Sequence, residues 1–188
     1  GSTPTLADCT IENNSAEYYG GGIYCDYNAA PYLTQCTISN NAASSAGGLH
    51  CEGSSVPSLS ACTISGNTAA DIGGGIFCST SSPIITDCTI TSNVAGGSGG
   101  GGIWCYYQSL PLISSTVLCD NSPDQILGSW SDGGANTIAD ECPVDCDGDI
   151  TGDGLVGVDD LLTVIAAWGN PYDVNDMLTV IDNWGPCP

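Results

Sequence analysis

The chain repeats itself every 26–27 residues, and each repeat carries the same two short motifs. The first motif reads CTIENN at 9–14, CTISNN at 36–41, CTISGN at 62–67 and CTITSN at 88–93. The second reads GGGIYC at 20–25, AGGLHC at 46–51, GGGIFC at 73–78 and GGGIWC at 100–105. A fixed period of this length indicates one supersecondary unit per repeat, stacked on its neighbours. A fifth, shorter copy at 111–121 reads PLISSTVLCDN.

Apolar and polar residues alternate over short runs within each repeat, which is the period of a β-strand. Cys9 and Ile11 therefore share one face and Thr10 the other. Clusters of glycine, asparagine and serine separate the runs, as turns require. Such short strands, repeated in register, predict one rung of a parallel β-helix. The rival solenoid, a leucine-rich repeat, lacks its leucine ladder here.

The repeat resembles that of the polymorphic outer-membrane protein family. The matching segments are IENNSA…GGGI at 11–23, ISNNAA…GGL at 38–49, ISGNTA…GGGI at 64–76 and ITSNVA…GGGI at 90–103. The resemblance covers roughly residues 3–125 and implies a right-handed parallel β-helix. We expect an all-β domain of about five coils over 1–140, followed by a small α-helical module over 141–188.

Three residue types recur at fixed places in the coils, and we interpret them as structural. An asparagine amide can donate to and accept from its equivalent one coil away. A glycine allows a corner that no Cβ could occupy, and a proline suits a coil start that needs no ladder donor. The asparagines are Asn14, Asn41, Asn67, Asn93 and Asn121, the glycines Gly22, Gly48, Gly75 and Gly102, and the prolines Pro4, Pro31, Pro57, Pro83 and Pro111.

Twelve cysteines favour an oxidising, extracellular or cell-surface location. Eight form two inward columns: Cys9, Cys36, Cys62 and Cys88, and Cys25, Cys51, Cys78 and Cys105. Bonds along one column are disfavoured, since in-register Cβ atoms lie about 4.8 Å apart. Bonds across the lumen would give the pairs 9–25, 36–51, 62–78 and 88–105. The four remaining cysteines are Cys119, Cys142, Cys146 and Cys187. Their order in the sequence predicts the pairs 119–142 and 146–187. The alternative for the columns is eight buried thiols that act as small hydrophobes.

The charge balance excludes several partners. The chain has no lysine or arginine and 21 acidic residues. Nucleic acids and anionic membranes both require a basic surface, so neither is expected as a partner. No run of about 20 apolar residues is present, so membrane insertion is not expected.

Four residues between the inward Ile and Cys of the second motif are predicted to face outward: Tyr24, His50, Phe77 and Trp104. They would form an exposed aromatic stripe. The rings could stack on one another or lie under the C-terminal module, or they could bind sugar rings or another subunit. Asn13 is the one asparagine in a glycosylation sequon, NNS.

The segment DITGDGLVGVDD at 149–160 matches a twelve-residue calcium loop, with Gly154 at its sharp sixth position. We expect one calcium ion, held by side-chain oxygens and one backbone carbonyl. The side chains are Asp149, Thr151, Asp153 and Asp160, and the carbonyl is that of Leu155. Helical spacing follows over 158–168 and again over 174–184.

This segment resembles a dockerin module, with two similar helices and a calcium loop before the first. The resemblance covers about 145–185. The second loop at 169–173 is too short for a calcium site. Val158 and Asp159 stand where cellulosomal dockerins carry a Ser-Thr pair, so cohesin is not favoured as the partner.

The first functional hypothesis is a non-enzymatic extracellular structural protein whose subunits assemble end to end. Its basis is the open first coil, whose unpaired strand edges can template further pairing. The alternative is a carbohydrate-binding or adhesion module that uses the aromatic stripe. A polysaccharide-active enzyme is less favoured, since the sequence shows no converging pair of carboxylates and no basic residue.

Overall fold

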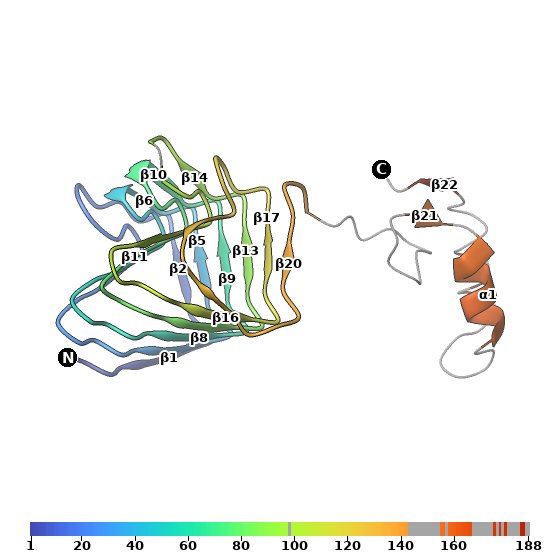
Figure 1. The fold of residues 1–188 in the computed structure, drawn as a ribbon, viewed down its shortest axis with the longest axis horizontal. Coiled ribbons are helices and arrows are strands. Elements are labelled where there is room, and N and C mark those ends of the chain that lie inside the picture. Colours follow the sequence, from blue (N-terminus) through green and yellow to red (C-terminus); the bar gives the residue numbers. More distant parts are fainter. Residues whose placement is uncertain are drawn as a thin grey trace. The chain divides into compact units, whose positions relative to one another are not determined.

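Stacked coils of short parallel strands form the first of two compact units, Gly1–Cys142 and Pro143–Pro188 (Figure 1). The computed structural model describes residues 1–97 and 99–142, together with 155–156, 158–166, 175, 177, 179 and 185–186. Every strand of the first unit pairs in parallel with its equivalent in the next coil. This is the parallel β-helix that the repeat predicts, with about five turns.

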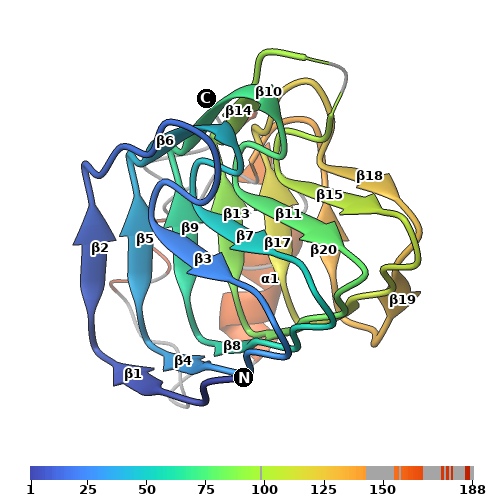
Figure 2. The ribbon, with the colours of Figure 1, turned by 90° about the vertical axis from the view of Figure 1, so that its left-hand side faces the viewer.

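Two six-stranded sheets form neighbouring faces of each coil. Sheet A contains β1 (Thr5–Ala7), β4 (Tyr32–Thr34), β8 (Ser58–Ser60), β12 (Ile84–Thr86), β16 (Leu112–Ser114) and β19 (Ser131–Asp132). Sheet B contains β2 (Thr10–Glu12), β5 (Thr37–Ser39), β9 (Thr63–Ser65), β13 (Thr89–Thr91), β17 (Val117–Cys119) and β20 (Thr137–Ile138). Figure 2 shows the strands of sheet B side by side, one from each coil.

Two further sheets complete the coils. Sheet D contains β3 (Ile23–Cys25), β7 (Leu49–Cys51), β11 (Ile76–Ser79), β15 (Ile103–Tyr106) and β18 (Ile126–Gly128). The smaller sheet C contains β6 (Ala42–Ser45), β10 (Thr68–Ile72) and β14 (Val94–Ala95). The register of β10 against β6 shifts between Ala69 and Ile72, and this irregularity places Ile72 opposite Ser45.

The core is a set of aliphatic columns, because each three-residue strand points its middle or first residue inward. In the second coil Leu33, Ile38 and Leu49 are 1%, 0% and 0% exposed. The equivalent residues of the next coils, such as Leu59, Ile64 and Ile76, are also fully buried. The alternation read from the sequence is therefore confirmed for the inward faces.

The asparagine column forms the predicted ladder. The Asn41 Nδ2 atom donates to Asn67 Oδ1 at 3.0 Å, and the Asn67 Nδ2 atom donates to Asn93 Oδ1 at 2.9 Å. The left-handed backbone of the corner falls one residue before each ladder asparagine, for example at Asn40 with φ 54°. The ladder positions therefore require asparagine for the hydrogen bonds of its side-chain amide and not for a left-handed backbone conformation.

Glycine is required at the next corner for lack of space. A Cβ on Gly75 would lie 2.7 Å from the Gly102 carbonyl oxygen, closer than real Cβ atoms approach. The Gly75 amide also donates to the Gly101 carbonyl at 2.8 Å, so the backbones of adjacent coils meet directly here.

The cysteine pairings predicted across the lumen are wrong, whereas the one between Cys119 and Cys142 is confirmed. Cys119 and Cys142 form a disulfide with a Cα–Cα distance of 4.8 Å. The other eight cysteines of the first unit are free thiols: Cys9, Cys25, Cys36, Cys51, Cys62, Cys78, Cys88 and Cys105. Their sulfur contacts run along each column instead of across the lumen; for example, the Cys62 amide donates to Cys88 Sγ at 3.4 Å. Cys146 and Cys187 lie outside the described residues.

In the second unit, helix α1 spans Val158–Ala166, inside the segment for which the sequence predicts a helix. Strands β21 (Leu155–Val156) and β22 (Gly185–Pro186) pair in antiparallel fashion. Asp149, Thr151 and Asp153 of the predicted calcium loop lie outside the described residues, and of Leu155 and Asp160 only the backbone is described. No helix in the described part of the chain is long and apolar enough to cross a membrane.

Candidate functional site

The aromatic stripe exists on sheet D, but the expectation that all of it is exposed is wrong. Tyr24, His50, Phe77 and Trp104 occupy one register position on successive strands. Tyr24 is 46% exposed, whereas His50 and Phe77 are only 1% and 6% exposed. Other side chains of the coil cover the middle of the stripe: the Tyr19 ring lies 4.8 Å from the His50 ring, measured between centroids.

The covered part of the stripe lies in a cleft of about 540 Å³. Its lining comes from sheet D, from strands β6 and β10 of sheet C, and from the loop before β3. The lining residues are Tyr18, Tyr19, Ser44, Ser45, His50, Glu52, Asp71, Ile72, Phe77, Ser79 and Tyr106. The cleft thus combines aromatic faces with hydroxyl groups and carboxylates.

The aromatic rings are in mutual contact along the stack. Phe77 lies 5.5 Å from Trp104 and 6.4 Å from Tyr106 between ring centroids. Trp104 and Tyr106 meet edge to face at 5.6 Å. Tyr106 remains 53% exposed, so it presents an open ring face at the side of the cleft.

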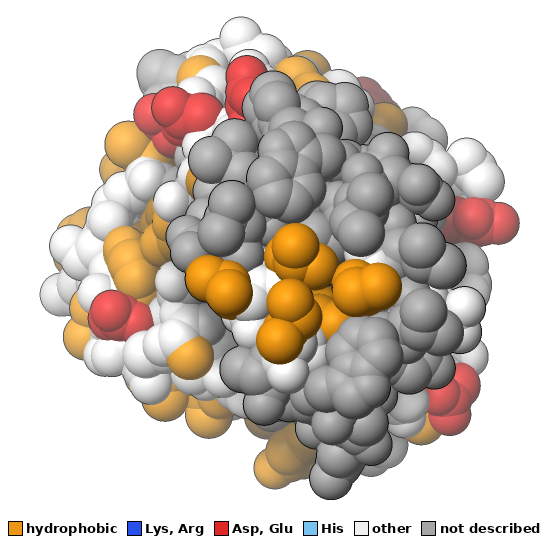
Figure 3. Space-filling view, turned by 90° about the vertical axis from the view of Figure 1, so that its right-hand side faces the viewer, with side chains coloured by type: hydrophobic (Ala, Val, Ile, Leu, Met, Phe, Trp, Pro, Cys, Tyr) orange, Lys and Arg blue, Asp and Glu red, His pale blue; other side chains and the backbone are white. Residues whose placement is uncertain are grey.

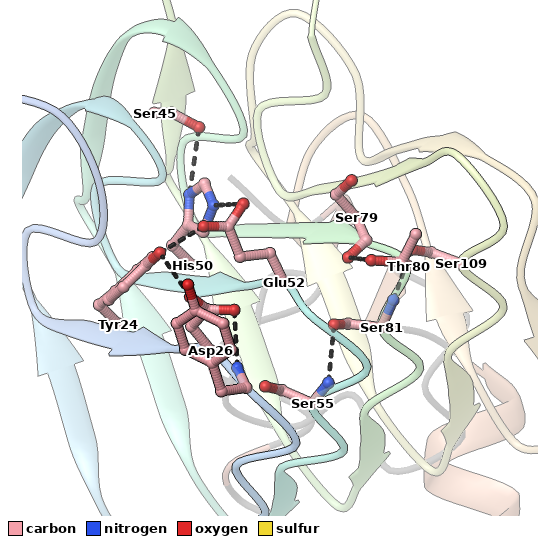
Figure 4. Close-up of polar contacts among 11 residues, drawn as sticks. Tyr24, Asp26, Ser45, His50, Glu52, Ser55, Ser79, Thr80, Ser81 and Ser109 are labelled. Carbon is pink, nitrogen blue, oxygen red and sulfur yellow. Dashed lines mark hydrogen bonds and ion pairs between the residues drawn. The ribbon is translucent and has the colours of Figure 1, made fainter. Parts of the chain in front are cut away.

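A polar network surrounds the buried histidine (Figure 4). Ser45 Oγ lies 3.3 Å from His50 Nδ1, and Glu52 Oε2 lies 3.6 Å from His50 Nε2. Because a carboxylate only accepts, the hydrogen belongs on Nε2, and the Ser45 hydroxyl donates to Nδ1. The 3.6 Å separation exceeds hydrogen-bond length, so Nε2 is a buried donor without a hydrogen-bond partner among the described residues.

Two carboxylates from adjacent coils meet at the edge of this network. The Tyr24 hydroxyl donates to Glu52 Oε1 and lies 3.4 Å from Asp26 Oδ2. The acidic residues that appear scattered in the sequence are therefore partly gathered here. Asp71 lines the same cleft from β10.

The network shifts two pKa values. Burial lowers the pKa of His50, although the nearby Glu52 carboxylate opposes the shift. The hydrogen bond to Glu52 raises the pKa of the Tyr24 hydroxyl, with burial adding to it. At neutral pH the site therefore holds a neutral imidazole and a phenol that keeps its proton.

The arrangement can bind groups that carry hydroxyls on an apolar ring. The carboxylates accept hydrogen bonds and the exposed aromatic rings, such as that of Tyr106, pack against C–H faces. Within the described ranges no cluster of three or more histidine, cysteine, aspartate or glutamate side chains could hold a metal ion.

The alternation of inward and outward residues could have predicted Tyr106 as a member of the stripe. Strand β15 continues past Cys105 and places Trp104 and Tyr106 on the same outward face. Tyr19, in the loop before β3, and Ser45, at the end of β6, gave no such signal, since they approach His50 only in the folded coil. The sequon residue Asn13 is exposed and has a φ of 58°, so it is accessible at a corner.

Comparisons with known proteins bear on the fold. A family model described as the right-handed beta helix region matches residues 1–147. No curated protein and no solved structure matches the chain significantly.

Proposed function

The chain belongs to the right-handed beta helix family, and from this premise we propose that it is an extracellular carbohydrate-binding protein whose ligand lies in the cleft over sheet D. One observation carries the proposal. The cleft of about 540 Å³ places the half-exposed ring of Tyr106 beside the accessible carboxylates of Glu52 and Asp71. A ligand that stacks on the Tyr106 ring and donates its hydroxyls to the two carboxylates satisfies both features.

The charge of the protein selects the kind of sugar. With no lysine or arginine and a formal net charge of −21, the chain repels anionic polysaccharides. Figure 3 shows acidic side chains and no basic ones on the face that it draws. The proposed ligand is therefore a neutral oligosaccharide.

The test is binding of neutral oligosaccharides to the full chain, first on an array and then by titration calorimetry. Tyr106→Ala removes an open ring face and should weaken binding roughly tenfold, the equivalent of about 1.4 kcal/mol. Tyr32→Ala is the matched control, because Tyr32 is 57% exposed on sheet A and does not line the cleft. Equal binding by both variants, or no binding by the native chain, would reject the proposal.

A second candidate is hydrolysis of ester groups carried by such a sugar, and the Ser45–His50–Glu52 contacts favour it. A hydroxyl that donates to a neutral imidazole, with a carboxylate on the far side, is the arrangement that activates a serine nucleophile. Release of acetate from acetylated neutral polysaccharide, abolished by Ser45→Ala with sugar binding retained, would support this activity. Binding without release would leave the first proposal alone.

The C-terminal module contributes separately to the proposal. We infer that the dockerin-like segment binds one calcium ion and attaches the β-helix to a partner other than cohesin. The support is the spacing of Asp149, Asp153 and Asp160 in the sequence. Calorimetric titration should show one site per chain, and Asp153→Ala should abolish it; two equivalent sites would contradict the assignment.

A further inference from the structure

We propose that the two cysteine columns are cross-linking sites, in which disulfides join neighbouring coils along the helix axis as Cys9–Cys36, Cys62–Cys88, Cys25–Cys51 and Cys78–Cys105. The inference is independent of the proposed carbohydrate binding. It starts from register. Cys25 pairs with Cys51, Cys51 with Cys78, and Cys78 with Cys105 on adjacent strands of sheet D. Each thiol therefore lies next to its equivalent one coil away.

The chain already contains one bond of this kind. Cys119 ends β17, which pairs with β20, and Cys142 lies in the segment just after β20. The disulfide Cys119–Cys142 therefore joins two adjacent coils, with a Cα–Cα distance of 4.8 Å. This distance equals the usual spacing of neighbouring strands, about 4.8 Å, and falls within the range of about 4.4–6.8 Å that disulfides span. The spacing of the coils is thus compatible with axial bonds.

The columns lie where the backbone can adjust. Cys25 and Cys51 end their strands, as Cys119 does. Cysteines of the other column come just before their sheet B strands, next to a corner residue of positive φ such as Ala61. In-register Cβ atoms on neighbouring strands lie slightly farther apart than in most disulfides, and cysteines at strand ends and corners have more freedom to shorten that distance. Cys78 and Cys105 lie one residue before the ends of β11 and β15, so their pair needs the larger adjustment.

Contacts that involve the sulfur atoms also support axial disulfides. The Cys62 amide donates to Cys88 Sγ at 3.4 Å, so the Cys88 sulfur reaches the neighbouring coil. A hydrogen bond from Cys88 lowers the pKa of the Cys62 thiol to about 6. A hydrogen bond from the Cys51 thiol likewise lowers the pKa of the Cys25 thiol. In each of these pairs the lowered pKa favours the thiolate form of one cysteine, which is the nucleophile in disulfide exchange.

The length of the columns selects the pairing. Gly128 follows Cys105 in register on sheet D. In the other column the Cys88 amide donates to Thr116 Oγ1 at 3.3 Å, so a hydroxyl takes the next sulfur position. Each column therefore holds four cysteines, and only pairing the first with the second and the third with the fourth leaves none unpaired.

The chemistry needs a small-molecule disulfide as oxidant, for which glutathione disulfide serves. A protein thiolate displaces one glutathione thiolate and forms a mixed disulfide, and the neighbouring protein thiolate then displaces the second. Two protein S–H bonds and the S–S bond of glutathione disulfide are lost. One protein S–S bond and two glutathione thiols are formed.

The test is to refold the reduced full chain in a buffer of reduced and oxidised glutathione and to map its bonds by mass spectrometry. Circular dichroism first verifies that the β-sheet has re-formed. Pepsin replaces trypsin, because the chain has no lysine or arginine. The expected result is loss of all eight thiols of the two columns to alkylation, with the four axial pairs recovered. Bonds within a coil, such as Cys9–Cys25, or alkylated column thiols in the refolded protein, would overturn the proposal.

A variant checks the pairing itself. In Cys88→Ser we expect Cys62 to stay a free thiol, which alkylation in denaturant detects, while the other three axial pairs form, because Cys62 is 1% exposed and its site has no room for glutathione. Cys119→Ser is the control, in which all four axial pairs should remain. Transfer of Cys62 to Cys78, across the lumen, would contradict the axial assignment.

Discussion

Asn67 shows how one buried polar side chain serves three coils. Its Oδ1 atom accepts from the backbone and side-chain nitrogens of Asn41 at 3.0 Å each. Its Nδ2 atom donates to the Ile38 carbonyl and to Asn93 Oδ1, both at 2.9 Å. The residue is fully buried, so none of these groups has water as a substitute.

Asn67→Leu should therefore lower the free energy of unfolding by about 3 kcal/mol or more, because each buried partner left unsatisfied costs about 1–3 kcal/mol. Urea denaturation measures the loss. The control is Asn13→Gly, at an exposed corner where glycine also accepts a positive φ, and its change should stay within about 0.5 kcal/mol. A loss no larger than that of the control would show that the ladder contributes little.

His50 makes stability depend on pH in a defined direction. Burial lowers its folded pKa, whereas the unfolded chain keeps a pKa near about 6.5. The unfolded state then binds the proton first, so the free energy of unfolding falls as pH drops from 7 through 6.5 toward the folded pKa. Urea midpoints between pH 7 and pH 5 should decrease for this reason.

His50→Gln is the variant that isolates this effect, because His50 is the only histidine of the chain. Glutamine keeps a polar group near Ser45 and does not titrate. Its urea midpoint should fall less over the same interval than that of the native chain, because the interval lies above the ordinary pKa values of carboxylates and only a free Cys62 thiol, with a pKa of about 6, would still titrate there. If the urea midpoint of the variant fell with pH as steeply as that of the native chain, the group that takes up the proton would not be His50.

At the scale of the elements, the sequence predicts what faces inward better than what faces outward. The columns of Leu33, Ile38 and Leu49 follow directly from period-two alternation. The burial of His50 and Phe77 could not be predicted in this way, because the side chains that cover them, such as Tyr19, come from a loop with no periodic signal. The sequence does not reveal the axial sulfur contacts, because most of the column cysteines lie at strand ends or beside corners, where the regular spacing of strands does not fix the distance between sulfurs.

The last coil depends on one covalent element, the bond between β17 and the segment after β20. Cys119→Ser opens a loop of sequence separation 23 and should lower the free energy of unfolding by about 3 kcal/mol. Denaturation at equal protein concentration gives the value. Cys142→Ser should produce the same loss, and the double variant no further loss, since both remove one bond.

At the scale of the whole molecule, end-to-end assembly stays a prediction. The first coil leaves Leu6, Ile11 and Ile23 half-buried, whereas their equivalents in the second coil are covered. An apolar hollow of about 150 Å³ lies there, lined in part by Leu6, Ile23 and Leu33. Complete burial of such a side chain is worth about 1.5–3 kcal/mol, and these half-buried side chains gain the remaining part of it when a partner covers them.

Sedimentation of the full chain across salt and calcium concentrations tests assembly. Salt and calcium should favour it, because they screen the net charge of −21. Ile11→Asp should abolish it, whereas Thr10→Asp, on the outward face of the same strand, should not. A single monomeric species under all conditions would reject the prediction.

The direction of the hydrogen bonds has a mechanical consequence. Nearly every backbone bond between coils, such as that from the Thr63 amide to the Cys36 carbonyl, runs along the helix axis. A force that pulls the two ends of the β-helix apart acts on all coil boundaries in series, and the boundaries can break one at a time because each coil contacts only its neighbours. With the cysteines reduced, so that no disulfide joins neighbouring coils, each rupture frees 26–27 residues, which extend to about 90 Å. Single-molecule stretching should record a train of nearly equal steps, so that the protein yields as a tether that lengthens in increments under constant load.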